Sequence, residues 1–201
     1  MSMRSHSMDS STTANTDSEN MHGKKKAGDK VTPITLFAID GSTFSLEAMR
    51  GQRYMLSFFR FAACPFCNLR MHELVSNYSK LGGSFSIVAI FHSPLENLQR
   101  YVSGHDAIFP VLADEEARYY REYAIERSIS GVLKGMVTRM PTLIKAMAKG
   151  YLPTRIKGDM TIMPADFLVD ERGIIRTAYY GKDEGDHLPF DQVKAFALSE
   201  V

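Results

Sequence analysis

The stretch "YMLSFFRFAACPFCNLRMHEL", residues 54–74, constrains the fold more than any other part of the chain. Its first six residues are almost continuously apolar or aromatic, which indicates a strand buried on both faces. A C-P-F-C motif then opens an amphipathic stretch that runs to Lys80 and stops at Gly82-Gly83, which predicts a helix with Pro65 in its first turn. A buried strand that leads directly into a helix indicates an α/β fold with both cysteines at the junction.

The rest of the chain alternates between strand and helix patterns. Short apolar runs around Asp40-Gly41 predict a β-hairpin, and "MPADFLVDERGIIRTAYYG" (163–181) predicts a second, antiparallel one. Further strands are expected at 84–93 and 108–114, and helices at 94–104, 115–125 and 186–200. This order predicts a parallel or mixed sheet with helices packed on it.

Two regions depart from this pattern. Residues 1–30 hold few apolar side chains and predict a disordered tail. We interpret "KKK" (24–26) as solvated rather than as an electrostatic tether. One domain is expected over 31–201. Around 126–160 we expect a helical insertion in a stretch, 118–159, that holds nine Lys or Arg against three Asp or Glu. We interpret it as lying on the domain, with a dimer face or an active-site lid as alternatives. Its one apolar face comprises Ile129, Val132, Leu133, Met136, Val137 and Met140.

Composition narrows the function classes. The net charge is +1, so there is no overall electrostatic footprint for nucleic acid. No apolar run approaches the roughly 18 residues that cross a bilayer, and the first residues do not resemble a secretory signal, so we expect a soluble protein with no membrane partner. The two cysteines are too close together to staple distant parts of a domain, which predicts a reducing, cytoplasmic location.

The C-x-x-C spacing places Cys64 and Cys67 on one face of the predicted helix. The helix N-terminus stabilises a thiolate at Cys64, the expected nucleophile, and Cys67 is placed to resolve a mixed disulfide or sulfenic acid formed there. Two alternatives stay open. The cysteines can be small core residues, or half of a zinc site, although zinc needs about four ligands and the chain has no second C-x-x-C or H-x-x-x-H.

The element order, together with "RFAACPFCNLRMHEL" and "MPADFLVD", resembles the thioredoxin-like fold and in particular the peroxiredoxin-like branch of the AhpC/TSA (redoxin) family. The resemblance covers most of residues 31–200. It implies an α/β thioredoxin-like fold: a central mixed sheet flanked by helices, with an N-terminal β-hairpin and a helical insertion.

The resemblance also implies a cis-proline directly before the strand that faces the C-x-x-C motif. Pro164 of "MPADF" matches it better than Pro141 of "MPTLI", because the residues after Pro141 continue at helical spacing. Asp166, close to Pro164, is a candidate proton acceptor. His92, at the end of its predicted strand, is a further candidate because ligands gather at the carboxyl ends of parallel strands.

The chain departs from the family pattern at the peroxide site. Ordinary peroxiredoxins resemble P-x-x-x-T-x-x-C around the reactive cysteine, whereas Ser57 and Phe61 stand at the Pro and Thr positions here. The family also tends to place an Arg where this chain has Pro164. The groups that polarise the peroxide O–O bond are therefore missing, which favours dithiol exchange over peroxide reduction.

Arg60, four residues before Cys64, is the candidate replacement cation. The alternative interpretation is that Arg60 lies at the strand edge and pairs with a carboxylate. Arg70 and His72 stand about 9 and 12 Å further along the helix and are interpreted as solvated or structural.

These features predict a thiol-dependent oxidoreductase with an antioxidant role, which reduces disulfides or peroxides with Cys64 as nucleophile and Cys67 as resolving thiol. Pro164 is expected to shape the substrate groove and Arg60 to assist Cys64. No cofactor is needed beyond the cysteines, and electrons would come from a thioredoxin- or glutathione-type donor. Whether the chain forms a homodimer stays open. The alternatives from other classes are a redox sensor, in which the disulfide switches the partners of the basic region, and a zinc-binding interaction module.

Overall fold

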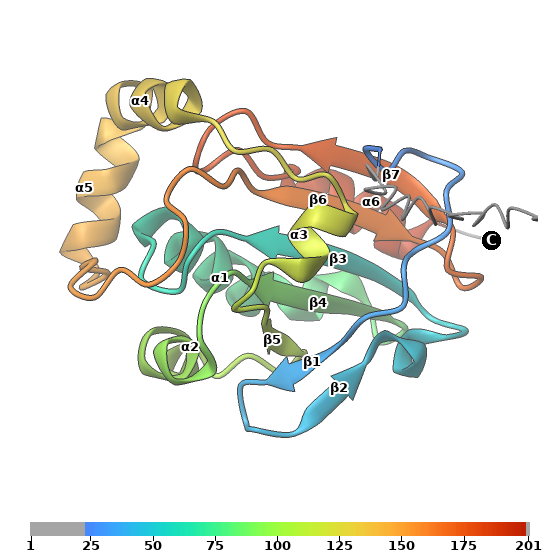
Figure 1. The fold of residues 1–201 in the computed structure, drawn as a ribbon. Helices are drawn as coiled ribbons and strands as arrows, with labels where there is room; N and C mark the ends of the chain where they lie inside the picture. The colour runs from blue at the N-terminus through green and yellow to red at the C-terminus, as the bar shows by residue number, and fades with distance from the viewer. Residues whose placement is uncertain (1–22, 200–201) are drawn as a thin grey trace, which may run out of the picture.

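The computed structural model describes residues 23–199 and contains one seven-stranded mixed sheet in the order β2-β1-β5-β4-β3-β6-β7 (Figure 1). Parallel pairs join β3 to β4 and β4 to β5, and the other neighbours are antiparallel. The mixed sheet and both hairpins are confirmed. The strands are β1 (Thr35–Ala38), β2 (Thr43–Ser45), β3 (Arg53–Phe59), β4 (Phe85–Phe91), β5 (Val111–Ala113), β6 (Ala165–Val169) and β7 (Ile175–Tyr180).

Helices cover both faces of this sheet (Figure 1). Side chains of α1, α2 and α6 join the sheet residues Phe59 and Phe91 in one core cluster, while Tyr120 of α3 belongs to the cluster on the opposite face. This arrangement confirms the thioredoxin-like α/β architecture. The helices are α1 (Pro65–Asn77), α2 (Leu95–Val102), α3 (Arg118–Glu122), α4 (Ile129–Thr138), α5 (Met140–Ala148) and α6 (Phe190–Leu198), with 3-10 turns at Leu46–Met49, Tyr78–Leu81 and Ser103–His105.

Strand β3 lies in the interior of the sheet, where it pairs with β4 on one side and β6 on the other. All seven of its residues pair in parallel with β4, from Arg53 opposite Phe85 to Phe59 opposite Phe91. Six of the seven are buried, as the continuous apolar run predicts. The C-P-F-C motif therefore follows the carboxyl end of a buried interior strand.

The predicted boundary of the N-terminal tail is wrong for residues 23–30, and residues 1–22 lie outside the described part of the chain. Gly28 donates its backbone N–H to the Ile175 carbonyl at 2.8 Å, and Ile175 donates to the Asp29 carbonyl at 2.9 Å. Lys24 is exposed and forms a surface ion pair with Glu126. Composition missed this segment because backbone groups, rather than apolar side chains, attach it to β7.

The helix predicted at 115–125 is shorter, and the helical insertion is divided in two. Ala117 and Ala124 have positive φ angles of 52° and 46°, which confines α3 to 118–122. Pro141 occupies the first turn of α5, where its missing N–H is harmless, so the helical interpretation of "MPTLI" is confirmed. Among residues 23–199, no helix has the length and hydropathy needed to cross a membrane.

The apolar face of α4 does not lie on the domain as expected. The buried residues of α4 are Gly131 and Gly135, whereas Leu133 and Val137 are 62% and 78% exposed. A β-carbon added at Gly131 would lie 2.8 Å from the Lys182 carbonyl oxygen. The helix therefore packs closely against the chain beyond β7 through its glycines, and this approach turns its large apolar side chains outward.

Candidate active site

The strand-to-helix junction holds Cys64 in a defined conformation. Cys64 is the N-cap of α1, with extended backbone angles, and Pro65 is the first helical residue. Asn68 fixes the turn: its backbone N–H donates to the Cys64 carbonyl at 3.0 Å, and its side-chain amide donates to the Ala62 carbonyl at 2.8 Å. The local sequence thus places the Cys64 side chain at the positive end of the helix.

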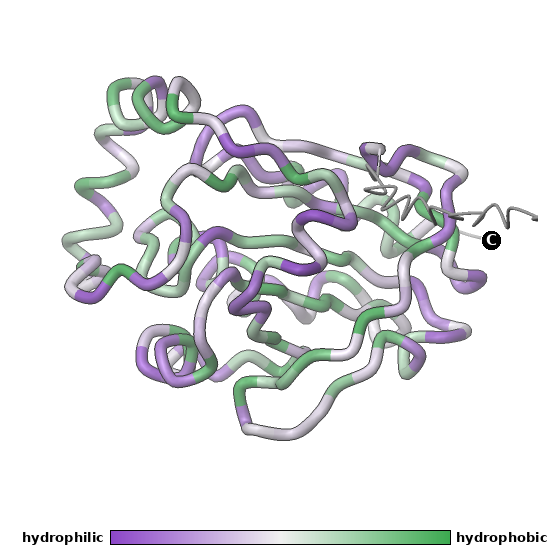
Figure 2. Tube along the Cα trace, viewed as in Figure 1, coloured by the Kyte–Doolittle hydropathy of each residue, from purple (hydrophilic) through white to green (hydrophobic). Residues whose placement is uncertain are grey.

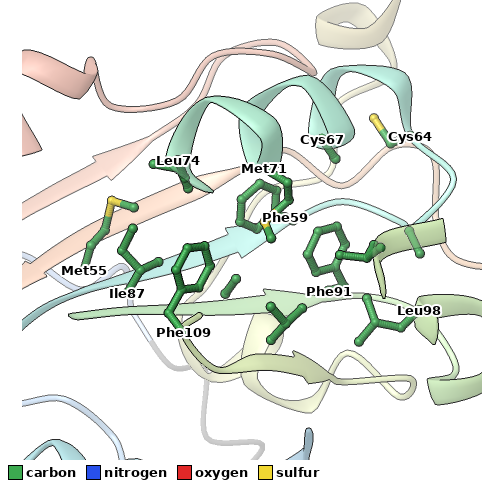
Figure 3. Close-up of a cluster of buried hydrophobic side chains, with 14 of the residues drawn as sticks. Met55, Phe59, Cys64, Cys67, Met71, Leu74, Ile87, Phe91, Leu98 and Phe109 are labelled. Atoms are coloured by element: carbon green, nitrogen blue, oxygen red, sulfur yellow. The ribbon is translucent and has the colours of Figure 1, made fainter. Parts of the chain in front are cut away.

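Both cysteines are free thiols and both are fully buried, with 0% of each residue exposed. Figure 3 shows them at the start of α1, at the border of the apolar cluster that contains Phe59 and Phe91. A substrate therefore reaches Cys64 only after a neighbouring segment moves.

The surroundings of Cys64 favour its thiolate. Burial by itself raises the pKa of this thiol, but a hydrogen bond from the Cys67 thiol, the charge of Arg60, and the backbone N–H groups of Cys67 and Phe66 lower it. The combined effect lowers the pKa of Cys64 from 9.0 to about 6. A substantial fraction of the thiol is therefore ionised at neutral pH, which is the form that acts as a nucleophile.

Cys67 behaves in the opposite way. Burial raises its pKa well above 9.0, and its hydrogen bond to Cys64 and the negative charge of the Cys64 thiolate raise it further. Cys67 therefore stays protonated while Cys64 is ionised. This difference assigns distinct chemical properties to the two thiols of one C-x-x-C motif.

Arg60 lies beside the Cys64 thiol, as its candidate role requires. It is 3% exposed, and its Nη1 lies 3.6 Å from the Cys64 sulfur. Its Nε donates to the Ile162 carbonyl at 2.9 Å and its Nη2 donates to the Met160 carbonyl. Backbone carbonyls thus take the place of the carboxylate partner that the alternative interpretation required, and the guanidinium keeps its charge next to the sulfur.

The segment that holds Arg60 also packs against His92. Asp159 donates its backbone N–H to His92 Nδ1 at 2.9 Å, and a β-carbon added at Gly158 would lie 2.4 Å from the His92 carbonyl oxygen and 2.9 Å from Phe61 Cβ. Burial lowers the pKa of His92. Residues 158–162, here called the covering segment, therefore lie over the end of the strand that precedes Cys64.

Pro164 immediately precedes β6, as predicted, but its peptide bond is trans because no cis peptide bond occurs among residues 23–199. The cis expectation carried over from the family is therefore wrong. The Met163 N–H donates to the Glu126 carbonyl and the Pro164 carbonyl accepts from Gly181, so extended backbone pairing fixes the chain on both sides of this bond. The register of Ala165 opposite Phe58 places Pro164 alongside the end of β3.

Asp166 belongs to a buried polar network. Ser57 donates to its Oδ1 at 2.5 Å, the Leu188 N–H donates to Oδ2 at 2.7 Å, and His187 Nδ1 lies 3.0 Å from Oδ2. Burial raises the pKa of Asp166, but the opposing effects of His187, Arg70 and Ser57 lower it to about 2. These partners favour a structural carboxylate over the predicted proton acceptor.

Sequence reasoning missed His187, whose side chain is only 4% exposed and whose Nε2 is buried without a hydrogen-bond partner. It also missed Glu184, which is 1% exposed with both carboxylate oxygens unpartnered. Burial raises the pKa of Glu184, whereas the nearby charge of Arg60 lowers it. No local pattern identifies these residues, because their surroundings come from α4, β3 and β6.

Arg70 and His72 lie away from the thiols, in agreement with their structural interpretation. Arg70 Nη2 donates to the Leu188 carbonyl at 2.7 Å, and exposed His72 pairs with Lys149 at 3.0 Å. Both residues line a groove of about 920 Å³ between α1, α5 and residues 185–194. Pro164 does not line this groove, so the expected substrate groove shaped by Pro164 gains no support. The cationic lining residues are Arg70, Lys80, Arg139, Lys145, Lys149 and Lys194, against the acidic Glu73 and Asp191.

Phe66, between the two cysteines, is also part of the groove wall, although neither cysteine is. Within residues 23–199, no group of three or more His, Cys, Asp or Glu side chains is arranged to hold a metal ion. The site is thus a dithiol with one adjacent guanidinium, next to a cationic groove.

Comparison with known families agrees with this architecture. Residues 27–178, about three quarters of the chain, match the model of the AhpC/TSA family. The chain belongs to the AhpC/TSA family. It is therefore a peroxiredoxin-like redoxin of the thioredoxin-like superfamily, and the resemblance inferred from "RFAACPFCNLRMHEL" and "MPADFLVD" is confirmed. No curated protein sequence is significantly similar to this chain.

Solved structures share the fold at low sequence identity. The thiol peroxidase from Chromobacterium violaceum has a TM-score of 0.60 at 13% identity and covers 87% of both chains. Peroxidoxin BcpB from Mycobacterium tuberculosis has a TM-score of 0.58 at 16% identity over 86% of this chain and 96% of its own. The thioredoxin domain of a thiol-disulfide oxidoreductase from Bacteroides vulgatus has a TM-score of 0.52 at 16% identity over 87% and 99%. These similarities show the fold.

Proposed function

We propose that this redoxin is a thiol-dependent oxidoreductase in which Cys64 attacks the substrate and Cys67 resolves the product. The observation that carries the proposal is the separation of the two thiol pKa values, lowered at Cys64 and raised at Cys67, at a helix N-terminus beside Arg60. Cys64 is ionised and can attack the substrate, whereas Cys67 stays protonated until it attacks the intermediate formed on Cys64.

With a disulfide substrate, the Cys64 thiolate attacks one sulfur, forms a mixed disulfide and releases the other sulfur as a thiolate that takes a proton. Cys67 then loses its proton and attacks the Cys64 sulfur, which forms the Cys64–Cys67 disulfide and releases the second substrate thiol. The substrate is reduced by two electrons and the enzyme dithiol is oxidised by two. Burial is the largest cause of the raised Cys67 pKa and persists, but once the Cys64 thiolate has reacted, its hydrogen bond and negative charge no longer raise the pKa of Cys67.

With a hydroperoxide, the thiolate attacks the terminal oxygen, leaves an alcohol or water, and becomes a sulfenic acid that Cys67 condenses with loss of water. Disulfide exchange is favoured over this route. Phe61 stands where the family places a threonine hydroxyl, and Ser57 donates its hydroxyl to Asp166. Arg60 is the cation that supports either chemistry.

The Cys64–Cys67 disulfide must be reduced by two electrons, which one dithiol or two monothiol molecules can supply. The cationic groove beside Phe66 supports an anionic donor of the thioredoxin or glutathione type. A cytoplasmic location follows from the use of cysteine and stays a prediction.

The complete burial of both sulfurs favours a second candidate, a redox sensor that reacts rarely and signals through its disulfide. Steady-state turnover separates the two. We expect the unmodified protein to reduce an insulin-type disulfide or a peroxide catalytically with a dithiol donor. Cys64→Ser should lose turnover, and Cys67→Ser should stop after it has formed one mixed disulfide. Stoichiometric oxidation without turnover in the unmodified protein would assign it to the sensor class.

A further inference from the structure

The outward face of the helical insertion carries most of the large apolar side chains that are exposed among the described residues. Of the thirteen large apolar side chains that are exposed among residues 23–199, ten lie between positions 129 and 160. Figure 2 shows the hydrophobic colouring along α4 and α5, which stand together at one end of the sheet in Figure 1. On α4 they are Ile129, Leu133, Met136 and Val137.

This exposure follows from how α4 packs. Gly131 and Gly135 form its inward face, and a β-carbon added at Gly135 would lie 1.8 Å from Glu184 Oε2. No rotation of the helix could bury its large side chains without pushing it away from this close contact. The apolar face is therefore fixed toward the outside.

The surface continues beyond α4. On α5, Met140, Ile144 and Met147 are exposed, and Leu152, Ile156 and Met160 are exposed along the chain that returns to β6. Four of the ten side chains are methionines, which adapt to an irregular or fluid partner. We call these ten side chains the 129–160 surface.

The charge near this surface helps to decide whether it binds a second copy of the chain or an anionic lipid bilayer. Residues 126–160 hold seven Lys or Arg against two Asp or Glu, whereas the chain as a whole is +1. Arg139, Lys145 and Lys149 line the groove beside α1 and Arg127 pairs with Asp159, so the cations left for this surface are the exposed Lys134, Arg155 and Lys157. A two-fold dimer through this face would bring the same cationic regions together. Arg155 and Lys157, both exposed, flank Ile156, and lysine is depleted from the cores of protein interfaces.

We propose that the 129–160 surface docks on an anionic lipid bilayer. Apolar side chains that enter the boundary between headgroups and acyl chains, with Lys and Arg beside them for the headgroups, are the composition that binds such a surface. The ten residues of α4 are about half of a spanning helix, so the contact is peripheral. The sequence predicted no membrane partner because it offered no spanning segment, and surface docking requires none.

The surface also reaches the thiol site. Met160 belongs to it, and the Met160 carbonyl accepts a hydrogen bond from Arg60, the neighbour of Cys64. Docking would therefore place the covering segment at the membrane. Because vesicle binding requires no thiol chemistry, its measurement is independent of the proposed function, and Cys64→Ser protein should bind like the unmodified chain.

The test is co-sedimentation of the full chain with vesicles of phosphatidylcholine alone or mixed with phosphatidylglycerol. We expect binding to the mixed vesicles that weakens with salt, and little binding to phosphatidylcholine. Leu133→Glu with Val137→Glu should abolish binding, and Arg155→Glu with Lys157→Glu should weaken it roughly tenfold or more. Ile108→Glu, a matched change at a side chain that is 73% exposed outside the surface, and Arg172→Glu should leave it unchanged.

Thermal unfolding of each variant confirms that it is folded, which these exposed positions should permit. Equal binding to both vesicle types, or binding that the Leu133 and Val137 changes leave intact, would overturn the proposal. A concentration-dependent dimer in solution that Leu133→Glu disrupts, with no vesicle binding, would assign the surface to a second copy of the chain instead.

Discussion

The guanidinium of Arg60 lies 3.6 Å from the sulfur of Cys64 while backbone carbonyls of residues 160 and 162 hold it in place. Through this contact a buried thiol gains a fixed positive charge in an apolar setting, where charge acts more strongly than in water. The relationship gives Arg60 a role in ionising Cys64 that can be measured directly.

Arg60→Met should raise the pKa of Cys64 by about one to two units, because an opposite charge in contact is removed. The pH dependence of alkylation at Cys64, followed by mass spectrometry, measures this shift. Arg70→Met is the matched control, since Arg70 is also buried but binds the Leu188 carbonyl and Glu73. A Cys64 pKa that is equal in both variants would show that Arg60 does not promote the ionisation of Cys64.

Gly158→Ala should increase the reactivity of Cys64 several-fold and lower stability. Gly158 has a φ of 122°, and an added β-carbon would meet the His92 carbonyl at 2.4 Å, so the covering segment must shift. The rate of reaction with dithiobisnitrobenzoate measures access to the thiol. Gly150→Ala is the control, because its φ is 88° but nothing lies within 4 Å of an added β-carbon. Equal rates in the two variants would show that the covering segment does not limit access.

Asp166→Asn should destabilise the protein by about 3 kcal/mol at neutral pH, because the hydrogen bonds that the charged carboxylate accepts from Ser57 and the Leu188 N–H are lost or become weaker bonds to a neutral amide. The pKa of Asp166 is lowered from 3.8 to about 2 in the fold, so the unfolded chain binds a proton at higher pH than the folded chain. The stabilisation is therefore complete above about pH 4 and is lost as the pH falls toward 2. Urea unfolding across this range measures it, and a difference between the two proteins that does not shrink with falling pH would contradict the assignment.

Gly135→Ala should destabilise the protein by about 1–3 kcal/mol through overpacking against Glu184. The same substitution in a Glu184→Ala background should cost much less, because the two sites are in contact and their effects are coupled. Chemical denaturation of the two single variants and the double variant gives the coupling. Additive effects would show that α4 does not rest on Glu184.

The parts of this fold that follow from the sequence are those set by neighbouring residues. Asp40-Gly41 identifies its hairpin, the apolar run before Cys64 identifies the buried strand β3, and Pro65 marks the start of α1. The pairing of Cys64 with Arg60 could be anticipated for the same reason, since the two are four residues apart.

What the sequence did not reveal depends on distant contacts. The apolar spacing in α4 suggested an inward face, but Gly131 and Gly135 allow a closer approach on the opposite side. Glu184 and His187 owe their burial to several elements, and residues 24–30 attach through backbone hydrogen bonds that composition does not register. Side-chain periodicity carries no information on any of these.

The most direct test of the account is mass spectrometry of the protein after stoichiometric oxidised glutathione or hydrogen peroxide, with each cysteine replaced by serine in turn. We predict that either oxidant produces an intramolecular Cys64–Cys67 disulfide in the unmodified protein. Cys67→Ser should keep a mixed disulfide or sulfenic acid on Cys64, and Cys64→Ser should stay unmodified. A first adduct on Cys67, or two thiols that react with neither oxidant, would contradict it.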